Sequence, residues 1–254
     1  MKRILVIILV ALTISPAYGQ QTNPTPTPTD IVINFYRALK MKNYMEGFRY
    51  SVYWGAVDGL SEAELKDLEP DFARTFSEIP EKIESRGEQI AGNLAVVFMK
   101  FDGIEKPQQV GLVRVGSQWL VGDEESLSQV KSQGHRFFFN MRMLVNETEV
   151  YELLSRLVDA QMIYSKNYER EFASFETLVK LDGLPKELED KESNGYRFEM
   201  TISDDKKTYS AIAVPVEYGK TGRLSFYADL YGVRAADAKG KPANNQSPLY
   251  KTLQ

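Results

Sequence analysis

The sequence predicts an α+β protein of two domains, each with helices followed by antiparallel strands. From residue 30 to about residue 80, apolar side chains recur at the spacing of helices, and from about 88 to 121 the pattern is that of short strands joined by turns. The same order returns after residue 137, with a long helical stripe and then strands from about residue 196. A polar stretch, 124–136, lies between the two patterns and predicts a linker that can include a short helix.

Composition limits the classes of function that the chain can have. A length of 254 residues allows one or two domains, and 43% hydrophobic and 26% charged residues are typical of globular proteins. The net charge is −4, the charges are interspersed, and no run of Lys or Arg marks a nucleic-acid partner. The chain has no cysteine, which excludes disulfides, thiolate metal sites, cysteine nucleophiles and lipidation at a cysteine.

The N-terminal residues have the pattern of a signal peptide. Lys2-Arg3 precedes the apolar run 4–14, and the small residues Ala17 and Gly19 follow it, so we predict a signal peptide 1–19 with cleavage after Gly19. The run is shorter than the about 20 residues of a membrane span, although an uncleaved anchor is the alternative. Cleavage would leave an exported protein, periplasmic or secreted, without an integral membrane segment. The Pro/Thr stretch 20–29 predicts an extended linker.

The first domain, 30–123, is predicted from caps and periodicity. Asp30 is expected to cap a helix that carries Ile31, Phe35 and Leu39 on one face. A short helix follows at about 44–52, and the capping box Ser61–Glu64 opens another helix. Strands are expected at 88–90, 94–101, 110–115 and 118–121, with turns at Gly92-Asn93, Asp102-Gly103 and Gly116-Ser117.

Three motifs of this domain resemble a known superfamily. They are Phe35-Tyr36-Arg37-Ala38-Leu39-Lys40 after Thr29-Asp30, the strand Ala91-Gly92-Asn93-Leu94-Ala95-Val96-Val97, and the hairpin 110–121 with Trp119 after its turn. The domain is similar to small secreted members of the ketosteroid isomerase-like, nuclear-transport-factor superfamily. The resemblance implies a curved sheet wrapped by helices around a conical cavity.

Such a cavity would make the first domain a candidate for ligand binding. The residues expected to line it are Tyr36, Tyr50, Tyr53, Trp54, Asp71 and Trp119. An acid–base pair would need a carboxyl group whose pKa is raised by burial, and Asp58, Asp71 and Glu78 are the candidates. None of these carboxyl groups has a diagnostic spacing. The alternative is that the aromatic residues form the core and that the carboxylates are solvated.

The second domain, 137–254, is predicted to be a long helix packed on an antiparallel sheet. The apolar run 137–145 fits either a buried strand or the start of the helix, and the helix itself is expected from Asn146, which would cap it with Glu149. Val150, Leu154 and Leu157 form its apolar stripe. A short helix near 172–178 and strands from about 196, 210 and 224 follow, and the tail from Lys239 is expected to be loose.

The helix and the sheet of this half share a set of residues with a known family. They include Glu147, Leu153, Leu157, Tyr164, Gly183-Leu184, Gly195-Tyr196, Ala213, Pro215, Gly219, Gly222-Arg223, Phe226 and Gly232. With these residues the half resembles the globular head of type IV pilins and of type II secretion pseudopilins. Assembling pilins carry a cleavable leader and a membrane-spanning helix that leads directly into the head. Here a signal pattern and another domain precede the head, which argues against assembly into a filament.

No catalytic residue, metal site or cofactor is predicted. His135 is the single histidine, which argues against a Ser-His-Asp triad or a multi-histidine metal site. Gly219-Lys220-Thr221-Gly222 lacks the spacing of a phosphate loop and is expected to be a turn. We therefore predict an exported, non-enzymatic binding protein of the bacterial cell envelope, whose partner is an envelope or secreted protein. The alternatives are a ligand-binding protein or enzyme that uses the first-domain cavity, and an accessory factor of a type IV pilus or type II secretion system.

Overall fold

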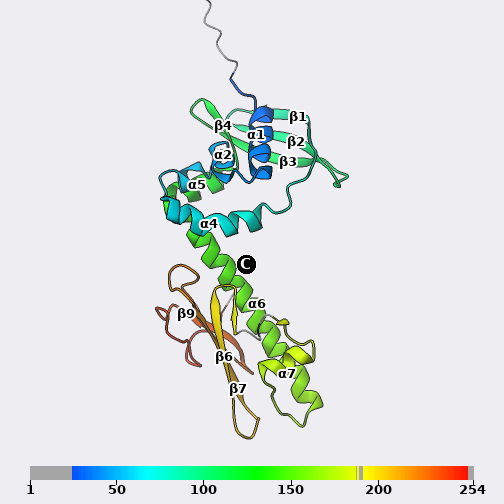
Figure 1. Ribbon diagram of the computed structural model, residues 1–254, viewed down its shortest axis with the longest axis vertical. Helices are drawn as coiled ribbons and strands as arrows, with labels where there is room; N and C mark the ends of the chain where they lie inside the picture. Colours follow the sequence, from blue (N-terminus) through cyan, green and yellow to red (C-terminus); the bar gives the residue numbers. More distant parts are fainter. Residues whose placement is uncertain (1–24, 187, 189–190, 251–254) are drawn as a thin grey trace, which may run out of the picture.

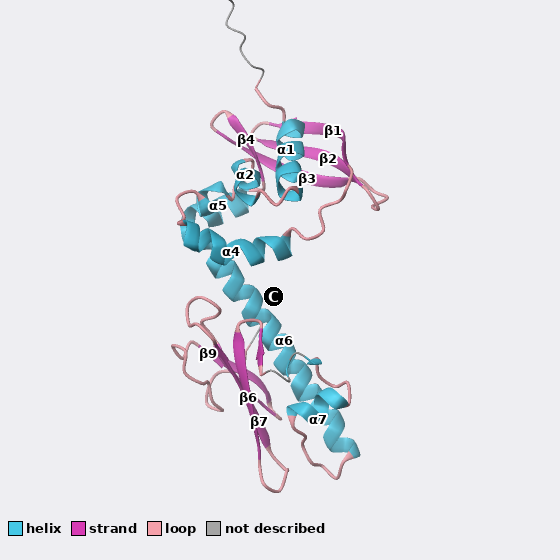
Figure 2. Ribbon diagram, in the orientation of Figure 1, coloured by secondary structure: helices cyan, strands magenta, loops and turns pink. Residues whose placement is uncertain are grey.

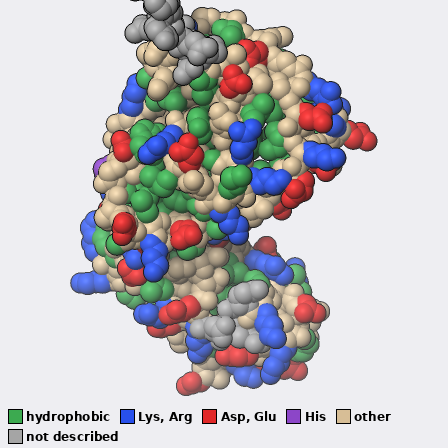
Figure 3. All heavy atoms as spheres, turned by 45° about the horizontal axis from the view of Figure 1, so that its top comes forward, with side chains coloured by type: hydrophobic (Ala, Val, Ile, Leu, Met, Phe, Trp, Pro, Cys, Tyr) green, Lys and Arg blue, Asp and Glu red, His purple; other side chains and the backbone are tan. Residues whose placement is uncertain are grey.

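A computed structural model describes residues 25–186, 188 and 191–250. The predicted signal peptide and the first residues of the predicted linker lie outside this range. The described chain forms two globular parts connected by one long helix, α6 (Figure 1). Helices and two antiparallel sheets are present, so the predicted α+β class is confirmed. On the face drawn in Figure 3, acidic and basic side chains are interspersed.

The first domain consists of four helices and a four-stranded antiparallel sheet in the order β1-β2-β3-β4. The helices are α1 (Pro28–Lys40), α2 (Tyr44–Arg49), α3 (Trp54–Val57) and α4 (Glu62–Thr75). The strands are β1 (Ile83–Ala91), β2 (Leu94–Phe101), β3 (Gln108–Val115) and β4 (Gln118–Val121). Alternate residues of β2, namely Ala95, Val97, Met99 and Phe101, are buried against the helices.

Two elements of this domain begin earlier than the sequence predicted. Thr27, not Asp30, is the N-cap of α1, because Asp30 closes a capping box in which its carboxylate accepts from the Thr27 N–H at 2.9 Å. Strand β1 starts at Ile83, and a bulge between Ser85 and Glu88 interrupts its alternation. Because of the bulge, the strand as a whole lacks the alternating pattern from which a strand is predicted, and its first half was not predicted.

The space between α2 and α4 is filled by aromatic rings. The ring centre of Phe48 lies 4.9 Å from that of Phe72 and 5.2 Å from that of Phe138, and Phe72 lies 5.0 Å from Phe138. Phe138 belongs to α6, so the connecting helix contributes to the core of the first domain. These aromatic residues therefore form core, as the alternative sequence interpretation held.

The segment predicted as a linker, 124–136, is helical. It forms α5 (Glu124–Gln133) and a short 3₁₀ helix, η1 (Gly134–Arg136). Val130 is its buried residue and packs with Ala56 and Phe137 in a small apolar cluster. Apart from Val130 and the partly buried Leu127, α5 is polar, and this composition made the segment resemble a linker.

Helix α6 (Phe137–Asn167) is shared by the two domains (Figure 2). Its first turn packs into the first domain through Phe137 and Phe139, whereas Val150 and Leu154 belong to the core of the second. The run 137–145 is thus the start of this helix. Asn146 lies inside the helix and is not its cap. Among the described residues, no helix is both long and apolar enough to span a membrane.

The second domain, here called the head, packs α6 and the short helix α7 (Phe175–Lys180) on a five-stranded antiparallel sheet in the order β5-β6-β7-β8-β9. Its strands are β5 (Glu192–Ser193), β6 (Tyr196–Ile202), β7 (Tyr209–Pro215), β8 (Ser225–Asp229) and β9 (Gly232–Ala236). Ala211, Ala213 and Ala228 lie in the buried core with the α6 leucines. These small side chains let the helix approach the sheet closely.

The tail predicted to be loose is packed as far as Tyr250. Pro248 accepts from the Ala235 N–H at 3.1 Å, and the Tyr250 N–H donates to Val233 O at 3.0 Å, so the tail pairs with β9. The Tyr250 ring lies 5.5 Å from Phe226 and 4.8 Å from Tyr151. Ala243, which is buried, and Tyr250, which packs on Phe226, anchor a mostly polar tail, and they explain the difference from the prediction.

Candidate functional site

The six residues predicted to line one cavity lie in separate places. Tyr50 and Trp119 share a groove on the first domain, and Tyr36 lines a different pocket. Tyr53 packs into the aromatic core, with its ring centre 5.6 Å from that of Phe137. The structure therefore divides the predicted set, and only Tyr50 and Trp119 come together.

The remaining two predicted residues are engaged by arginines. The guanidinium carbon of Arg49 lies 5.1 Å from the ring centre of Trp54, which is a cation–π arrangement. Asp71 accepts a hydrogen bond from Arg142 at 2.7 Å. Neither side chain is therefore a free group facing a cavity.

The groove that holds Tyr50 and Trp119 lies beside strand β4, between the start of α1 and the end of α2. We call it the Trp119 groove. It has a volume of about 580 Å³ and is lined by Thr25, Pro26, Ile31, Glu46, Arg49, Tyr50, Ser117, Gln118, Trp119 and Leu120. Pro26, Ile31, Trp119 and Leu120 are its apolar residues, and Glu46 and Arg49 are its charged ones. Apolar surface with a few polar groups is the usual composition of a binding pocket.

The charges around the Trp119 groove are mostly positive. The Tyr50 hydroxyl donates to Glu46 Oε1 at 3.0 Å, and this hydrogen bond raises the pKa of the Tyr50 phenol. Arg37 and Arg49 lie close enough to Tyr50 to oppose that rise in its pKa. The guanidinium carbon of Arg114 lies 5.6 Å from the Trp119 ring centre. Three arginines thus surround the groove, against one glutamate.

A second pocket, here called the Tyr36 pocket, lies between α1, the end of α4 and the β2–β3 loop. Its volume is about 450 Å³, and its lining is Phe35, Tyr36, Thr75, Phe76, Glu78, Ile79, Pro80, Phe101, Ile104, Gln108, Gln109 and Val110. The Tyr36 ring packs edge-on against Phe35 and Phe101 at 5.2 and 5.3 Å. Burial raises the pKa of Tyr36, which therefore stays protonated at neutral pH. Glu78, the candidate carboxyl group here, is exposed.

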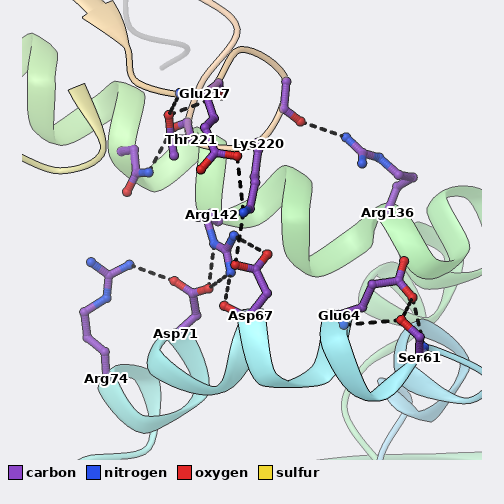
Figure 4. A network of polar contacts seen from close by, with 12 residues as sticks. Ser61, Glu64, Asp67, Asp71, Arg74, Arg136, Arg142, Glu217, Lys220 and Thr221 are labelled. Atoms are coloured by element: carbon purple, nitrogen blue, oxygen red, sulfur yellow. Dashed lines mark hydrogen bonds and ion pairs between the residues drawn. The ribbon is translucent and has the colours of Figure 1, made fainter. Parts of the chain in front are cut away.

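The junction of the two domains is centred on Arg142, a residue of α6 (Figure 4). Its Nε donates to Asp71 Oδ2 at 2.7 Å, and its Nη1 donates to Asp67 Oδ2 at 3.1 Å. The Arg142 side chain is only 10% exposed. Burial lowers the pKa of its guanidinium, but the hydrogen bonds to Asp71 and Asp67 outweigh burial and raise it, so the group stays charged.

The loop between β7 and β8 brings the head to the same place. Lys220 Nζ lies 3.4 Å from Asp67 Oδ1, and Arg136 Nη2 donates to Gly219 O at 3.2 Å (Figure 4). The loop is held from the other side by α6, where Asn146 donates to Thr221 O at 2.9 Å. Gly219-Lys220-Thr221-Gly222 is thus a turn, as predicted, and it contacts the first domain.

Sequence reasoning missed the residues of this junction. Asp67 is one of several acidic residues of α4 and carries no distinguishing pattern. Arg142 did offer a signal, since it stands between Met141 and Met143 within an apolar run. A charged residue in such a run indicates a buried ionic partner.

Metal chemistry finds no support within the described part of the chain, where no group of three or more His, Cys, Asp or Glu side chains is placed to hold an ion. His135 is occupied by a contact of its Nε2 with Asp58 O at 2.6 Å. No family model, curated protein or solved structure matches the chain. The resemblances to the ketosteroid isomerase-like superfamily and to pilin heads therefore stay predictions.

Proposed function

We propose that this chain is an exported, non-enzymatic binding protein of the cell envelope that recognises another protein through its first domain. The observation that carries the proposal is the Trp119 groove, which combines an apolar floor with charged groups at its rim. Such a combination provides affinity through apolar burial and specificity through a few polar contacts. The signal-peptide pattern of residues 1–19 supports the location.

The junction supports the same proposal, because it presents the groove on a pre-organised body. Arg142 ties α6 to α4, and Asn146 ties the same helix to the head one turn later. Because the two domains are already fixed relative to each other, a partner that contacts both would bind without an additional entropic cost of ordering them. The head would act as a second contact surface or as a spacer.

A blocked groove should abolish capture of the partner. We expect that the wild-type chain, immobilised and exposed to an envelope extract, retains a specific protein that a Ser117→Trp variant does not retain. Ser117 is an exposed groove residue, so the indole would occupy the groove without disturbing the core. Ser132→Trp, on the exposed face of α5, is the matched control and should capture normally. Equal capture by both variants would contradict a role of the groove, and no specific capture by any chain would contradict the binding function.

A second candidate function is the binding of a small apolar molecule in the Tyr36 pocket. The aromatic and aliphatic lining of that pocket favours it. We expect the neutral dye N-phenyl-1-naphthylamine to fluoresce on binding, and Ile104→Asn to reduce the signal several-fold because Ile104 lines the pocket. Ile90→Asn is the control, since Ile90 is also exposed but lies outside the pocket. Equal fluorescence of the two variants would remove this candidate.

A further inference from the structure

Strand β4 has one edge that is only partly paired. Val115 pairs with Gln118 across the two-residue turn, and Val113 pairs with Leu120, so the backbone groups of Gln118 and Leu120 point toward β3. Val121 uses the opposite edge, where its N–H donates to Tyr50 O at 2.8 Å and its carbonyl accepts from the Val52 N–H at 3.0 Å. Trp119 lies two residues before Val121, so its N–H and C=O point to this same edge.

The edge is unpaired at Trp119. No described hydrogen bond reaches Trp119 from the segment beside it, because the Tyr50 N–H, which could have continued the pairing, donates to Gly47 O at 3.0 Å. Gln118, Trp119 and Leu120, three consecutive residues of β4, line the Trp119 groove. The groove therefore runs along a short strand edge where the Trp119 N–H and C=O have no backbone partner among the described residues, and Trp119 as a whole is 8% exposed.

The surroundings of this edge select for negative charge. Arg49 lines the groove, Arg114 stands over the Trp119 ring, and Arg37 lies near Tyr50. The single opposing carboxylate, Glu46, accepts from the Tyr50 hydroxyl and also pairs with Arg49, whose Nη1 lies 3.7 Å from Glu46 Oε2. Three arginines thus share one carboxylate, and an occupant that carries carboxylates would complement the excess positive charge.

We propose that the Trp119 groove binds an extended segment of a partner protein that adds as a strand beside β4 and carries acidic side chains for Arg49 and Arg114. Strand addition gives affinity through main-chain hydrogen bonds, and side-chain pockets and charges give selectivity. The inference rests on the proposed binding function and names its ligand chemistry. The residues that immediately precede Thr25, Gln20–Pro24, are uncharged, so charge complementarity favours a partner segment over the chain's own.

Trp119 fluorescence in the full chain can test this directly. Trp54 is the other tryptophan, so a Trp54→Phe background makes Trp119 the reporter. The probes are a capped hexapeptide Thr-Val-Asp-Val-Glu-Thr, its Lys-for-Asp/Glu counterpart, and an acidic version with N-methylated backbone amides. We expect the acidic peptide to bind about tenfold more tightly than the basic one, an advantage that about 0.5 M salt removes, and N-methylation to weaken binding by a similar factor.

Substitutions of single arginines test which of them contact the acidic side chains of the peptide. Arg49→Gln and Arg114→Gln should each weaken binding of the acidic peptide about threefold to fivefold, while Arg86→Gln, an exposed arginine outside the groove, should leave it unchanged. Equal affinity for the acidic and basic peptides would overturn the charge assignment, and indifference to N-methylation would overturn strand addition. If the peptide binds only after residues 1–24 are removed, the groove is normally occupied by the chain's own N-terminal segment. If the peptide dissociates a dimer in sedimentation experiments, the groove is occupied by a second copy of the chain. Either result would contradict the proposal that the occupant is a segment of a different protein.

The two failures can be told apart. If no peptide binds, the proposed strand-addition site is wrong. The proposed binding function is tested by a different experiment, the comparison of partner capture by the wild-type chain and by Ser117→Trp.

Discussion

Replacing Arg142 by methionine is expected to lower the free energy of unfolding by about 3 kcal/mol, because Asp67 and Asp71 would lose the buried guanidinium that faces them. The two carboxylates are 32% and 23% exposed, so water can partly compensate them and the loss falls at the lower end of the range for broken buried pairs. Urea unfolding, followed by far-UV circular dichroism, measures the change.

Two further variants show whether burial of the guanidinium matters. Arg74 also pairs with Asp71, at 3.6 Å, but its side chain is 53% exposed, so Arg74→Met should cost about 1 kcal/mol or less. Arg142→Lys should fall between the two, since an ammonium keeps the charge but cannot contact both carboxylates as a planar fork. Similar losses for Arg142→Met and Arg74→Met would contradict the central place of Arg142 in the junction.

Phe48→Ala is expected to destabilise the protein by about 3–5 kcal/mol. Phe48 has no exposed surface, and its ring contacts Phe72, Phe76 and Phe138, so the substitution leaves a cavity among rigid rings. Because Phe138 belongs to α6, the loss should also loosen the start of that helix, which faster hydrogen exchange of the amides at 137–142 would reveal.

Phe98→Ala is the matched control for this substitution. Phe98 alternates with the buried residues of β2 and is only half-buried, on the outer face of the sheet. Its truncation should cost about 1–2 kcal/mol and leave hydrogen exchange in α6 unchanged. If the two variants lost equal stability, the aromatic cluster would not be the principal core of the first domain.

Local patterns in the sequence were sufficient to predict most of the secondary structure. The strands 94–101 and 118–121 follow from periodicity because alternate residues are buried, and 110–115 follows because the buried Val110 and Leu112 alternate with exposed residues. The apolar stripe of α6 follows from the helical spacing of Val150, Leu154 and Leu157. The bulge in β1 and the single buried residue of α5 each break that periodicity, and both elements were underestimated. Asn146 was misplaced because a capping residue and a helix-interior residue that bonds a distant loop look alike in sequence.

The candidate site was less predictable than the fold. Tyr50 and Trp119 were chosen as aromatic residues of a cavity, and they meet because residues 50–52 pair with Val121 of β4. Nothing local in the sequence specifies that pairing, which joins segments about 70 residues apart. The unpaired edge at Trp119 depends on strand register, and the set of arginines around it comes from α1, α2 and β3.

The sharing of α6 has a consequence for how the two domains are oriented. Each residue of an α-helix rotates the chain by about 100° and advances it by about 1.5 Å. Arg142 is held by the first domain and Asn146 by the head, so the angle between the domains is encoded in the number of residues between these two positions. A single inserted residue would swing the head through about 100° and carry Lys220 away from Asp67. Met143, between these two positions, is buried, so packing restricts which side chain can stand there, whereas the number of residues fixes the rotational phase of the whole molecule.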